Sequence, residues 1–251
     1  MFIGSQLGMI AGAGFAPLAA DFDGTNDSMA RGAALTGIAN SYTGILSFWL
    51  RLDGGDGASQ MVCQTGPDDY IQILRNASNK MRVTLQNGGS GVYIFETVST
   101  YTASATWRHF LASWDSTGGG TSHLYVNDVS DKTVISGSTG AIITLGSSTN
   151  FYICIDTIAG RRVNGALTEL YFAPAQYLDF SIESNRRKFI SSDGKPVDLG
   201  ATGSTPTGTA PIAYQTVRAG GVATDMATNR GTGGNFTITG TLDLITPSPW
   251  A

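Results

Sequence analysis

The stretch ATWRHFLASWDSTGGGTSHLYVND, residues 105–128, decides the fold. Within HFLASWD, the side chains of Phe110, Ala112 and Trp114 fall on one face of an extended chain, because successive residues of a strand point to opposite faces. The glycine triplet at 118–120 supplies the positive φ angles that a tight reversal needs, and the chain then returns as SHLYVND. The stretch therefore predicts a β-hairpin inside a large sheet rather than a catalytic constellation.

Similar segments recur from about residue 42 at a spacing of roughly ten residues, which is the rhythm of an antiparallel sandwich or barrel. The clearest is GILSFWLRL (44–52), which has one core face and one mixed face. The core face carries Leu46, Phe48, Leu50 and Leu52, and the mixed face carries Ile45, Ser47, Trp49 and Arg51. Further strands are predicted in QMVCQT, YIQILRN, KMRVTLQN, GVYIFET, FYICID and ALTELYFAP. One helix is predicted in SIESNRRKFI (181–190), with Ser181 as its N-cap.

Composition divides the chain into three parts. Residues 1–20 are apolar and interrupted by Gly, with no Lys or Arg, so they fit neither a signal peptide nor a membrane span and predict an extended assembly arm. Its contact residues are Met1, Phe2, Ile3, Leu7, Met9 and Ile10, and a homo-oligomer is the usual outcome of such contacts. Residues 21–194 form the predicted sandwich. Residues 195–251 begin with a loop or linker, GATGSTPTGTAP, and have too few apolar residues for their own core, so they are predicted to pack on the same domain.

Charge and cysteine content exclude several classes. The net charge is −4, and only 14% of the residues are charged, which argues against a nucleic-acid partner because phosphate binding needs clustered cations. The densest basic run, Arg186-Arg187-Lys188, stands beside Glu183 and is interpreted as a solvated turn or helix end. Cys63 and Cys154 lie in apolar strands, and two cysteines are few for a secreted disulfide scaffold, so reduced thiols are expected.

Four stretches resemble, in this order, the concanavalin A-like jelly roll of the laminin G-like type. They are DFDGTNDSMA (21–30), YTGILSFWLRLDG (42–54), WRHFLASWDSTGGGTSHLYVND (107–128) and RRVNGALTELYFAPAQYLDFSIESNRRKF (161–189). The resemblance implies an all-β antiparallel sandwich with one short helix. Two departures stand out: Asn127-Asp128 replaces the usual Asp-Gly, and Thr168-Glu169 replaces Asp-Glu. The second removes a carboxylate and puts in doubt a metal site that would use it.

The C-terminal stretches GSTPTGTAPIAYQT, NRGTGGNFTITGTL and SPW resemble the ends of laminin G-like proteins encoded by tailed bacteriophages and prophages. This resemblance implies a structural virion protein, either a head decoration or part of a tail or fibre appendage. Such a protein is made in the host cytoplasm and then assembled into the particle. A host-surface glycan is the expected external partner, and the arm would contact other virion proteins. A lectin module with no link to a virion is the alternative.

Concanavalin A-like folds also include glycoside hydrolases, which is the less favoured alternative. A retaining hydrolase needs two carboxyl groups about 5 to 5.5 Å apart. The laminarinase-type family carries them as E-x-D-x-E, whereas Glu96, Glu169 and Glu183 each stand without such a pattern. His109 and His123 are the two histidines, and without a nearby Cys or acidic third ligand they favour structural roles over zinc. We therefore expect no enzyme activity and no required cofactor.

Two binding hypotheses remain open. Asp21, Asp23, Asn26 and Asp27 offer four oxygen-bearing side chains within seven residues, which suits calcium, although the same residues also close turns. A sugar would need rings that cover its faces and polar groups that bond its hydroxyls. The candidates are Tyr70, Tyr93, Tyr101, Asp68, Asp69 and Asn87, and the alternative for the tyrosines is an ordinary half-buried strand position.

Overall fold

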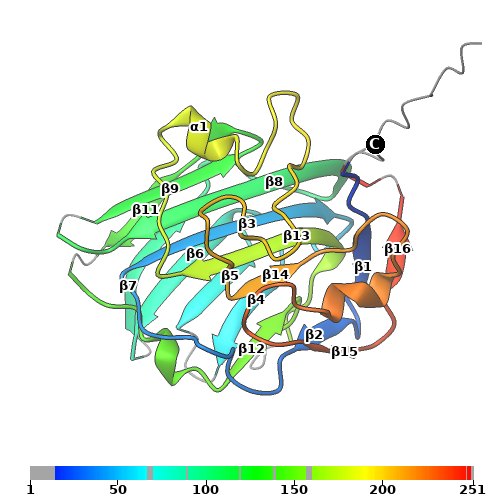
Figure 1. Cartoon of the computed structure of the whole chain (residues 1–251), viewed down its shortest axis with the longest axis horizontal. Coiled ribbons are helices and arrows are strands. Elements are labelled where there is room, and N and C mark those ends of the chain that lie inside the picture. Colours follow the sequence, from blue (N-terminus) through cyan, green and yellow to red (C-terminus); the bar gives the residue numbers. More distant parts are fainter. Residues whose placement is uncertain are drawn as a thin grey trace, which may run out of the picture.

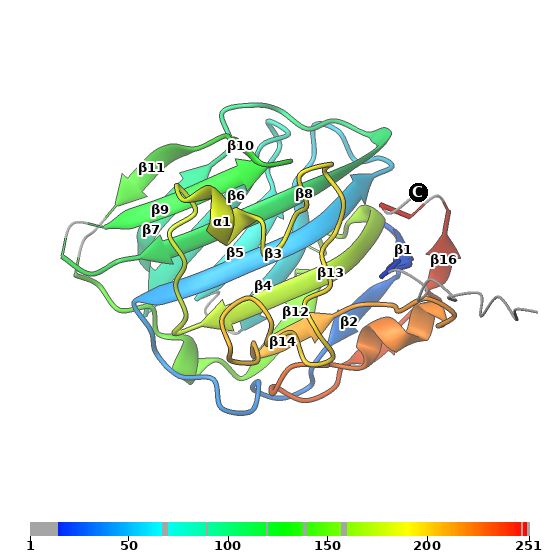
Figure 2. The ribbon, with the colours of Figure 1, turned by 45° about the horizontal axis from the view of Figure 1, so that its top comes forward.

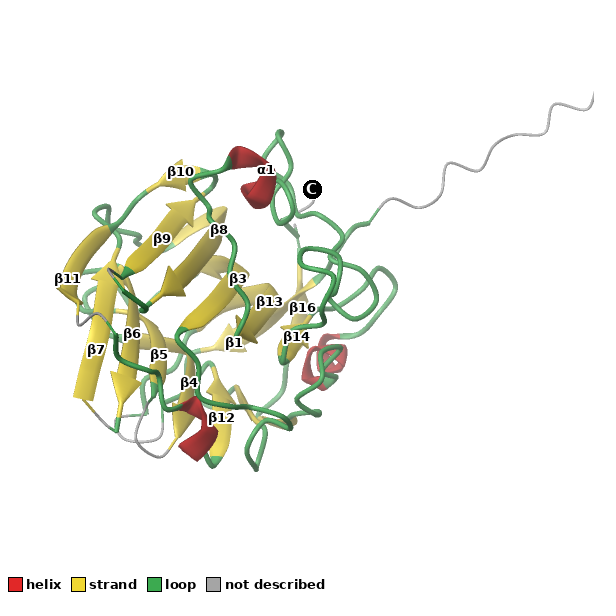
Figure 3. Cartoon of the chain, turned by 60° about the vertical axis from the view of Figure 1, so that its left-hand side comes forward, coloured by secondary structure: helices red, strands yellow, loops and turns green. Residues whose placement is uncertain are grey.

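The computed structural model describes residues 15–66, 70–88, 90–118, 120–137, 140–156, 160–246 and 248–249. Two antiparallel sheets lie face to face as a sandwich, with the connecting loops at their ends and over one face (Figure 1). Helix is confined to short segments, which stand out in red against the strands in Figure 3. The predicted all-β sandwich with one short helix is confirmed.

Each sheet is described by its strands in spatial order. Sheet 1 contains β10 (Val129–Ser130), β9 (Thr121–Val126), β8 (Ser104–Asp115), β3 (Thr43–Leu52), β13 (Asn164–Pro174), β1 (Ala19–Asp23) and β16 (Asp243–Ile245), with β14 (Ala213–Gln215) also paired to β13. Sheet 2 contains β11 (Thr133–Gly137), β7 (Ser90–Glu96), β6 (Met81–Asn87), β5 (Ile71–Arg75), β4 (Gln60–Gly66), β12 (Asn150–Ile153), β2 (Ser28–Ala30) and β15 (Thr237–Thr239).

The β8–β9 hairpin forms as the alternation in 105–128 predicts. Ala112 lies opposite Leu124, and the reversal between the strands uses positive φ angles at Gly118 and Gly120. Asn127 and Asp128 also adopt positive φ angles, 49° and 68°, and they begin the next turn into β10. Because Asn and Asp tolerate this region better than other non-glycine residues, they can stand where the family usually has Asp-Gly.

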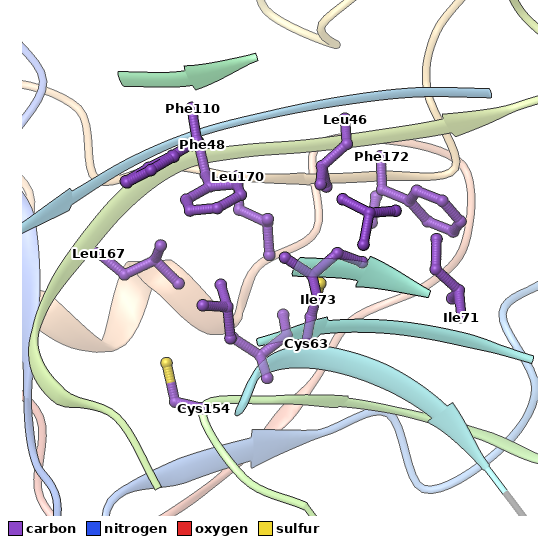
Figure 4. Packing of buried hydrophobic residues seen from close by; sticks show 14 of the residues in the cluster. Leu46, Phe48, Cys63, Ile71, Ile73, Phe110, Cys154, Leu167, Leu170 and Phe172 are labelled. Atoms are coloured by element: carbon purple, nitrogen blue, oxygen red, sulfur yellow. The ribbon is translucent and has the colours of Figure 1, made fainter. Parts of the chain in front are cut away.

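The main core lies between the two sheets. Phe48, Phe110 and Leu170 point down from sheet 1 towards Ile73 and Cys63 of sheet 2 (Figure 4). Phe48 and Phe110 stack with their ring centroids 5.2 Å apart. Burying each such side chain contributes roughly 1.5 to 3 kcal/mol. This face of β3 is the one that the alternation in GILSFWLRL predicted.

A second core covers the other face of sheet 1. The chain after β13 crosses that face, with α1 (Glu183–Arg186) above β9, β8 and β3 (Figure 2). The buried residues of this layer are Ile45, Leu111, Tyr171, Ala173, Phe180, Phe189, Leu199 and Tyr214. Trp49 and Ser47 are buried as well, at 3% and 2% exposure. The mixed face of β3 is therefore a covered face.

The boundaries of the three predicted parts shift in the structure. β1 begins at Ala19, and Leu18 bridges to Val217, so residues 18–20 belong to the sandwich rather than to an arm. Residues 1–14, which include all six predicted contact residues of the arm, lie outside the described part of the chain. Residues 195–251 supply β14 and β16 to sheet 1 and β15 to sheet 2, so this extension is woven into both sheets.

The predicted helix is shorter than its sequence pattern. α1 spans Glu183–Arg186, and Ile182 rather than Ser181 occupies the N-cap position. Ser181 instead donates from its backbone N–H and its hydroxyl to the Asp179 carboxylate, which makes a turn before the helix. Two 3-10 helices, η1 (Leu145–Ser147) and η2 (Ala223–Ala227), complete the elements. Across the described ranges, no helix is long and apolar enough to cross a membrane.

Candidate functional site

Two hollows that share a wall lie where the chain leaves β13 and meets the C-terminal extension. We call them together the threonine groove. The first, of about 240 Å³, is lined by Gly37, Ala39, Pro174, Ala175, Gln176, Thr209, Ala210, Ile212 and Thr232. The second, of about 360 Å³, is lined by Gln176, Tyr177, Leu178, Lys188, Thr205, Pro206, Thr207, Gly208 and Thr209. Because Gln176 and Thr209 line both, the two hollows adjoin one another.

One wall of the groove follows directly from the end of β13. Pro174 is the last residue of that strand, and Ala175 takes a φ of 63°, which turns the chain away from the sheet. The Ala175 N–H donates both to the Thr43 carbonyl and to the Ser41 hydroxyl, each at 3.0 Å. The turn is thus held against the start of β3, and residues 176–178 are placed beside the hollows.

The other wall is the loop 205–210, which the extension adds ahead of β14. Its backbone is fixed by hydrogen bonds from the Thr205 N–H to the Leu199 carbonyl at 3.1 Å and from the Gly208 N–H to the Ser204 carbonyl at 2.8 Å. The Thr207 hydroxyl also bonds to the Thr209 carbonyl at 3.0 Å. The loop is therefore shaped by its own hydrogen bonds before a ligand binds.

Gln176 joins the two walls. Its Oε1 accepts a hydrogen bond from the Thr207 hydroxyl at 2.6 Å, and its Nε2 donates to the Ala210 carbonyl at 3.3 Å. The Tyr171 hydroxyl, in the second core, also donates to Oε1 at 3.4 Å. This link holds residues that are about thirty positions apart in a fixed relation, which reduces the ordering that binding would need.

The chemistry of the lining is polar and largely uncharged. It offers four threonine hydroxyls, one amide, the Tyr177 ring and the Lys188 ammonium, and none of the described lining residues is acidic. The Tyr177 hydroxyl lies 3.2 Å from His123 Nε2, and burial raises the pKa of this phenol. Burial also lowers the pKa of His123, whose ring faces Asp179. The groove can therefore donate to and accept from hydroxyl groups, but its lining holds no pair of carboxyl groups for acid–base catalysis.

Glu169 is the carboxyl group that most resembles a catalytic acid by its pKa. Burial raises that pKa to about 7, against hydrogen bonds that lower it. The Tyr214 hydroxyl donates to Oε2 at 2.7 Å and the Thr216 hydroxyl to Oε1, so both oxygens are engaged within the protein. With an exposure of 2%, Glu169 joins β13 to β14 and does not face the groove.

The other two glutamates also have structural partners. Glu96 pairs with Arg82 at 2.7 Å and with Lys80 at 3.6 Å on sheet 2. Glu183 pairs with Arg187 at 2.9 Å on the surface of α1. The three glutamates thus sit in three separate environments, each with partners of its own.

The two histidines do not form a ligand pair. In the β8–β9 register His123 lies opposite Ser113, four residues along the strand from His109. His109 is fully buried, stacks on Trp49 at a centroid distance of 4.9 Å and bonds to the Ser47 hydroxyl at 2.8 Å. Burial lowers its pKa to about 3, so the ring is neutral in the folded protein. Throughout the described ranges, no group of three or more His, Cys, Asp or Glu side chains is arranged to hold a metal ion.

Comparison with known proteins places this sandwich in a family. The model of the concanavalin A-like lectin/glucanases superfamily matches residues 23–174, which is more than half of the chain. The chain belongs to this superfamily. The match ends at Pro174, where the threonine groove begins, so residues 176–178 and 205–210 lie beyond the matched part of the domain.

Comparison of this superfamily member with solved structures finds similar chains at low sequence identity. A "putative carbohydrate binding protein" from Bacteroides ovatus has a TM-score of 0.57 and 14% identity, over 94% of this chain and 62% of that one. A heptameric SAP-like pentraxin from Limulus polyphemus has a TM-score of 0.49 and 10% identity, over 65% and 78% of the two chains. Domains LG4-5 of the mouse laminin α1 chain have a TM-score of 0.44 and 12% identity, over 66% and 43%. The comparison with curated proteins finds no match.

Of the four residues proposed for calcium, Asp21 lies within β1, and Asp23, Asn26 and Asp27 lie at the turn that carries the chain from sheet 1 to sheet 2. Asp23 Oδ1 accepts hydrogen bonds from the backbone N–H groups of Thr25 and Asn26 at 2.7 and 3.0 Å, which lower the pKa of this carboxyl. Asp27 accepts from the backbone N–H groups of Asp23 at 3.1 Å and Thr241 at 2.8 Å. Asp21, by contrast, has its pKa raised by burial and by Asp53. The turn role is thus present in the structure, and calcium binding stays a prediction.

The residues proposed for sugar contacts are not brought together as a surface. Tyr70 and Tyr93 are each 5% exposed inside the main core, which corrects the prediction that their rings are presented to a ligand. Tyr101 packs edge-on against Phe110, and its hydroxyl donates to Asp131. Asn87 is exposed at the end of β6, whereas Asp68 and Asp69 lie outside the described residues. Tyr70 and Tyr93 are buried because the hydrophobic effect favours placing their rings in the main core.

One feature of the sequence points to the groove, but a search for strand patterns does not detect it. In GSTPTGTAP, threonines stand at 205, 207 and 209, between Gly and Pro residues that set tight turns. This stretch reads as a linker by composition. Only the fold shows that it returns to the segment after β13 and that Gln176 fixes it there.

Proposed function

We propose that the protein is a noncatalytic carbohydrate-binding protein of a tailed-phage virion, and that the threonine groove is its glycan site. The observation that carries the binding role is the groove itself: hydroxyls, an amide and one aromatic residue line a depression held in shape by Gln176. Sugars present hydroxyls that exchange hydrogen bonds with such groups, and a C–H face that packs on a ring. Membership of a superfamily of lectins and glucanases supports the same ligand class.

The noncatalytic part of the proposal rests on where the carboxyl groups lie. A glycosidase would present two of them to the sugar, whereas the described lining of the groove presents none. The raised pKa of Glu169 arises from burial beneath the second core, and its oxygens bond to Tyr214 and Thr216 instead of facing a ligand. The proposal therefore assigns to the groove the retention of a glycan and not its cleavage.

The virion part rests on the resemblance of the C-terminal stretches to phage-encoded laminin G-like proteins and on the apolar sequence of residues 1–14. In this proposal the N-terminal residues attach the protein to the particle and to other copies of itself, and the sandwich displays the groove towards the host surface. A head decoration and a tail or fibre appendage both fit this arrangement.

Calorimetric titration of the full chain with bacterial surface oligosaccharides tests the binding role. Thr207→Val removes the hydroxyl of a lining residue and its bond to Gln176, and we expect it to weaken binding by about fivefold, the usual effect of one hydrogen bond. Thr237→Val, on the exposed edge strand β15, is the matched control and should leave binding unchanged. Equal affinity of all three proteins would refute the assignment of the site.

Incorporation into particles tests the virion role separately. Deletion of residues 2–14 removes none of the described residues, so we expect the truncated protein to fold and keep its glycan affinity but fail to join particles. Normal incorporation of the truncated chain would contradict the anchoring role without touching the glycan site.

A further inference from the structure

We propose that the threonine groove selects acidic glycans, with the ammonium group of Lys188 pairing with a sugar carboxylate. The inference rests on the proposed glycan-binding function and deepens it by naming the ligand class. Its starting point is that Lys188 is the one charged residue among the described residues that line the two hollows.

The position of Lys188 is fixed by the layer that covers sheet 1. It is the second residue after α1, and its backbone N–H donates to the Asn185 carbonyl at 3.4 Å. The next residue, Phe189, is 2% exposed and packs edge-on against both Tyr171 and Phe180. This anchor holds the backbone of Lys188 at the rim, while its flexible side chain lines the hollow and can adjust to a ligand.

The basic run Arg186-Arg187-Lys188 divides into two different roles. Arg186 and Arg187 both bind the Asp128 carboxylate, at 2.5 and 2.6 Å, and so attach α1 to the turn after β9. Lys188 forms no such pair with any carboxylate of the described residues. The sequence alone suggested one solvated basic turn, whereas the structure uses two of the charges internally and leaves the third at the groove.

Two carboxylates close in sequence to the lining residues have partners of their own, and the charge of Asp179 also acts on Tyr177. Asp179 lies 3.3 Å from His123 and accepts two hydrogen bonds from Ser181. Glu183 pairs with Arg187. An anionic ligand would therefore meet a cation at Lys188 without facing an acidic residue in the lining, and a positive charge in a partly enclosed polar site favours a carboxylate over a neutral hydroxymethyl group.

The rest of the lining fits a sugar rather than a simple anion. The Thr205, Thr207 and Thr209 side chains lie along the same hollow as Lys188, and Tyr177 stands at its other wall. A volume of about 360 Å³ falls in the range of small-ligand sites. We therefore infer that the carboxylate binds at Lys188, while the hydroxyls of the same sugar or its neighbour bind the threonines and Gln176.

The test compares two trisaccharides that differ only in charge: trigalacturonate, and the trigalactose obtained by reducing its carboxyl groups. Each is titrated into the full chain, into Lys188→Met and into Lys188→Arg. Lys80→Met is the control for net charge, because Lys80 lies just before β6, outside the groove lining, where it pairs with Glu96 at 3.6 Å. Thermal unfolding of each variant checks that the fold is retained.

We expect wild type and Lys80→Met to bind trigalacturonate about five- to tenfold more tightly than trigalactose at low salt, with the difference shrinking as salt is added. Lys188→Met should abolish this preference while keeping affinity for the neutral sugar, and Lys188→Arg should retain most of it. Equal binding of both sugars by wild type, or a preference that survives Lys188→Met, would overturn the inference but leave glycan binding standing. Binding of neither sugar, in a chain that also fails to bind the surface oligosaccharides, would overturn both.

Discussion

Replacing Glu169 with Gln should remove the part of the pH dependence of this protein's stability that comes from one buried carboxyl group. The carboxyl is fully buried, and burial raises its pKa from 4.5 to about 7, against opposing hydrogen bonds from Thr216 and Tyr214. The folded state therefore holds a proton between about pH 4.5 and 7 that the unfolded state has released. Its stabilising effect is complete below the unfolded pKa and is lost as the pH rises through the folded pKa.

The size of the effect follows from that difference. Each pKa unit corresponds to about 1.4 kcal/mol, so the wild type should lose on the order of 3 kcal/mol from this group between pH 4.5 and 7.5. Gln cannot ionise, and its amide resembles the protonated carboxyl in shape. Glu169→Gln should therefore match wild type near pH 4.5 and be more stable above pH 7.

Urea denaturation of both proteins at intervals from pH 4.5 to 8.5 measures this difference directly. The quantity to compare is the difference in the free energy of unfolding between the two proteins at each pH. Burial lowers the pKa values of His109 and His123, so both histidines lower stability as the pH falls through the usual pKa range of histidine. These contributions are common to both proteins and cancel. Glu183→Gln, at an exposed ion pair, is the control and should change stability by less than about 0.5 kcal/mol. Parallel curves for wild type and Glu169→Gln would refute the reasoning.

Two further predictions concern the core. Gly165 on β13 has a φ of 154°, and a Cβ there would stand 2.0 Å from the Arg51 carbonyl oxygen of β3, so Gly165→Ala should destabilise the fold by roughly 3 to 5 kcal/mol because the central strands must separate. Thermal unfolding would measure this, and a loss below about 1 kcal/mol would show that the strands adjust freely. The thiols of Cys63 and Cys154 are buried and free, and burial raises both pKa values, so they should react with a thiol reagent only after unfolding. Rapid reaction in native buffer would contradict their placement in the core.

The sequence predicted those parts of the fold that depend on local alternation. Phe48 and Phe110 lie on the predicted core faces, because a period-two pattern and a glycine reversal can be recognised within a few residues. The sequence did not predict contacts between segments that are far apart in the chain. Trp49 shares its strand face with Ser47 and Arg51, yet it is buried and stacks on His109. Tyr93 looked available for a ligand, yet its strand presents it to the opposite sheet.

The candidate site illustrates the same limit. Its walls, at 174–178 and 205–210, are joined by Gln176 across about thirty residues, and no short-range pattern encodes that contact. The threonine spacing is visible in GSTPTGTAP, but it does not predict where this segment lies in the fold. Likewise, the sequence does not distinguish the three cations of the run Arg186-Arg187-Lys188. In the structure, the two arginines pair with Asp128, whereas Lys188 lines the groove.

Mapping a bound glycan on the protein by NMR tests the central claim most directly. Trigalacturonate, or an oligosaccharide found by the surface-glycan titrations, would be added to the isotope-labelled full chain and the backbone amide shifts followed. The account predicts that the shifts gather at residues 174–178, 188 and 205–209, with the sugar recovered uncleaved. Shifts gathered on the outer face of sheet 2, or new reducing ends in the recovered sugar, would contradict it.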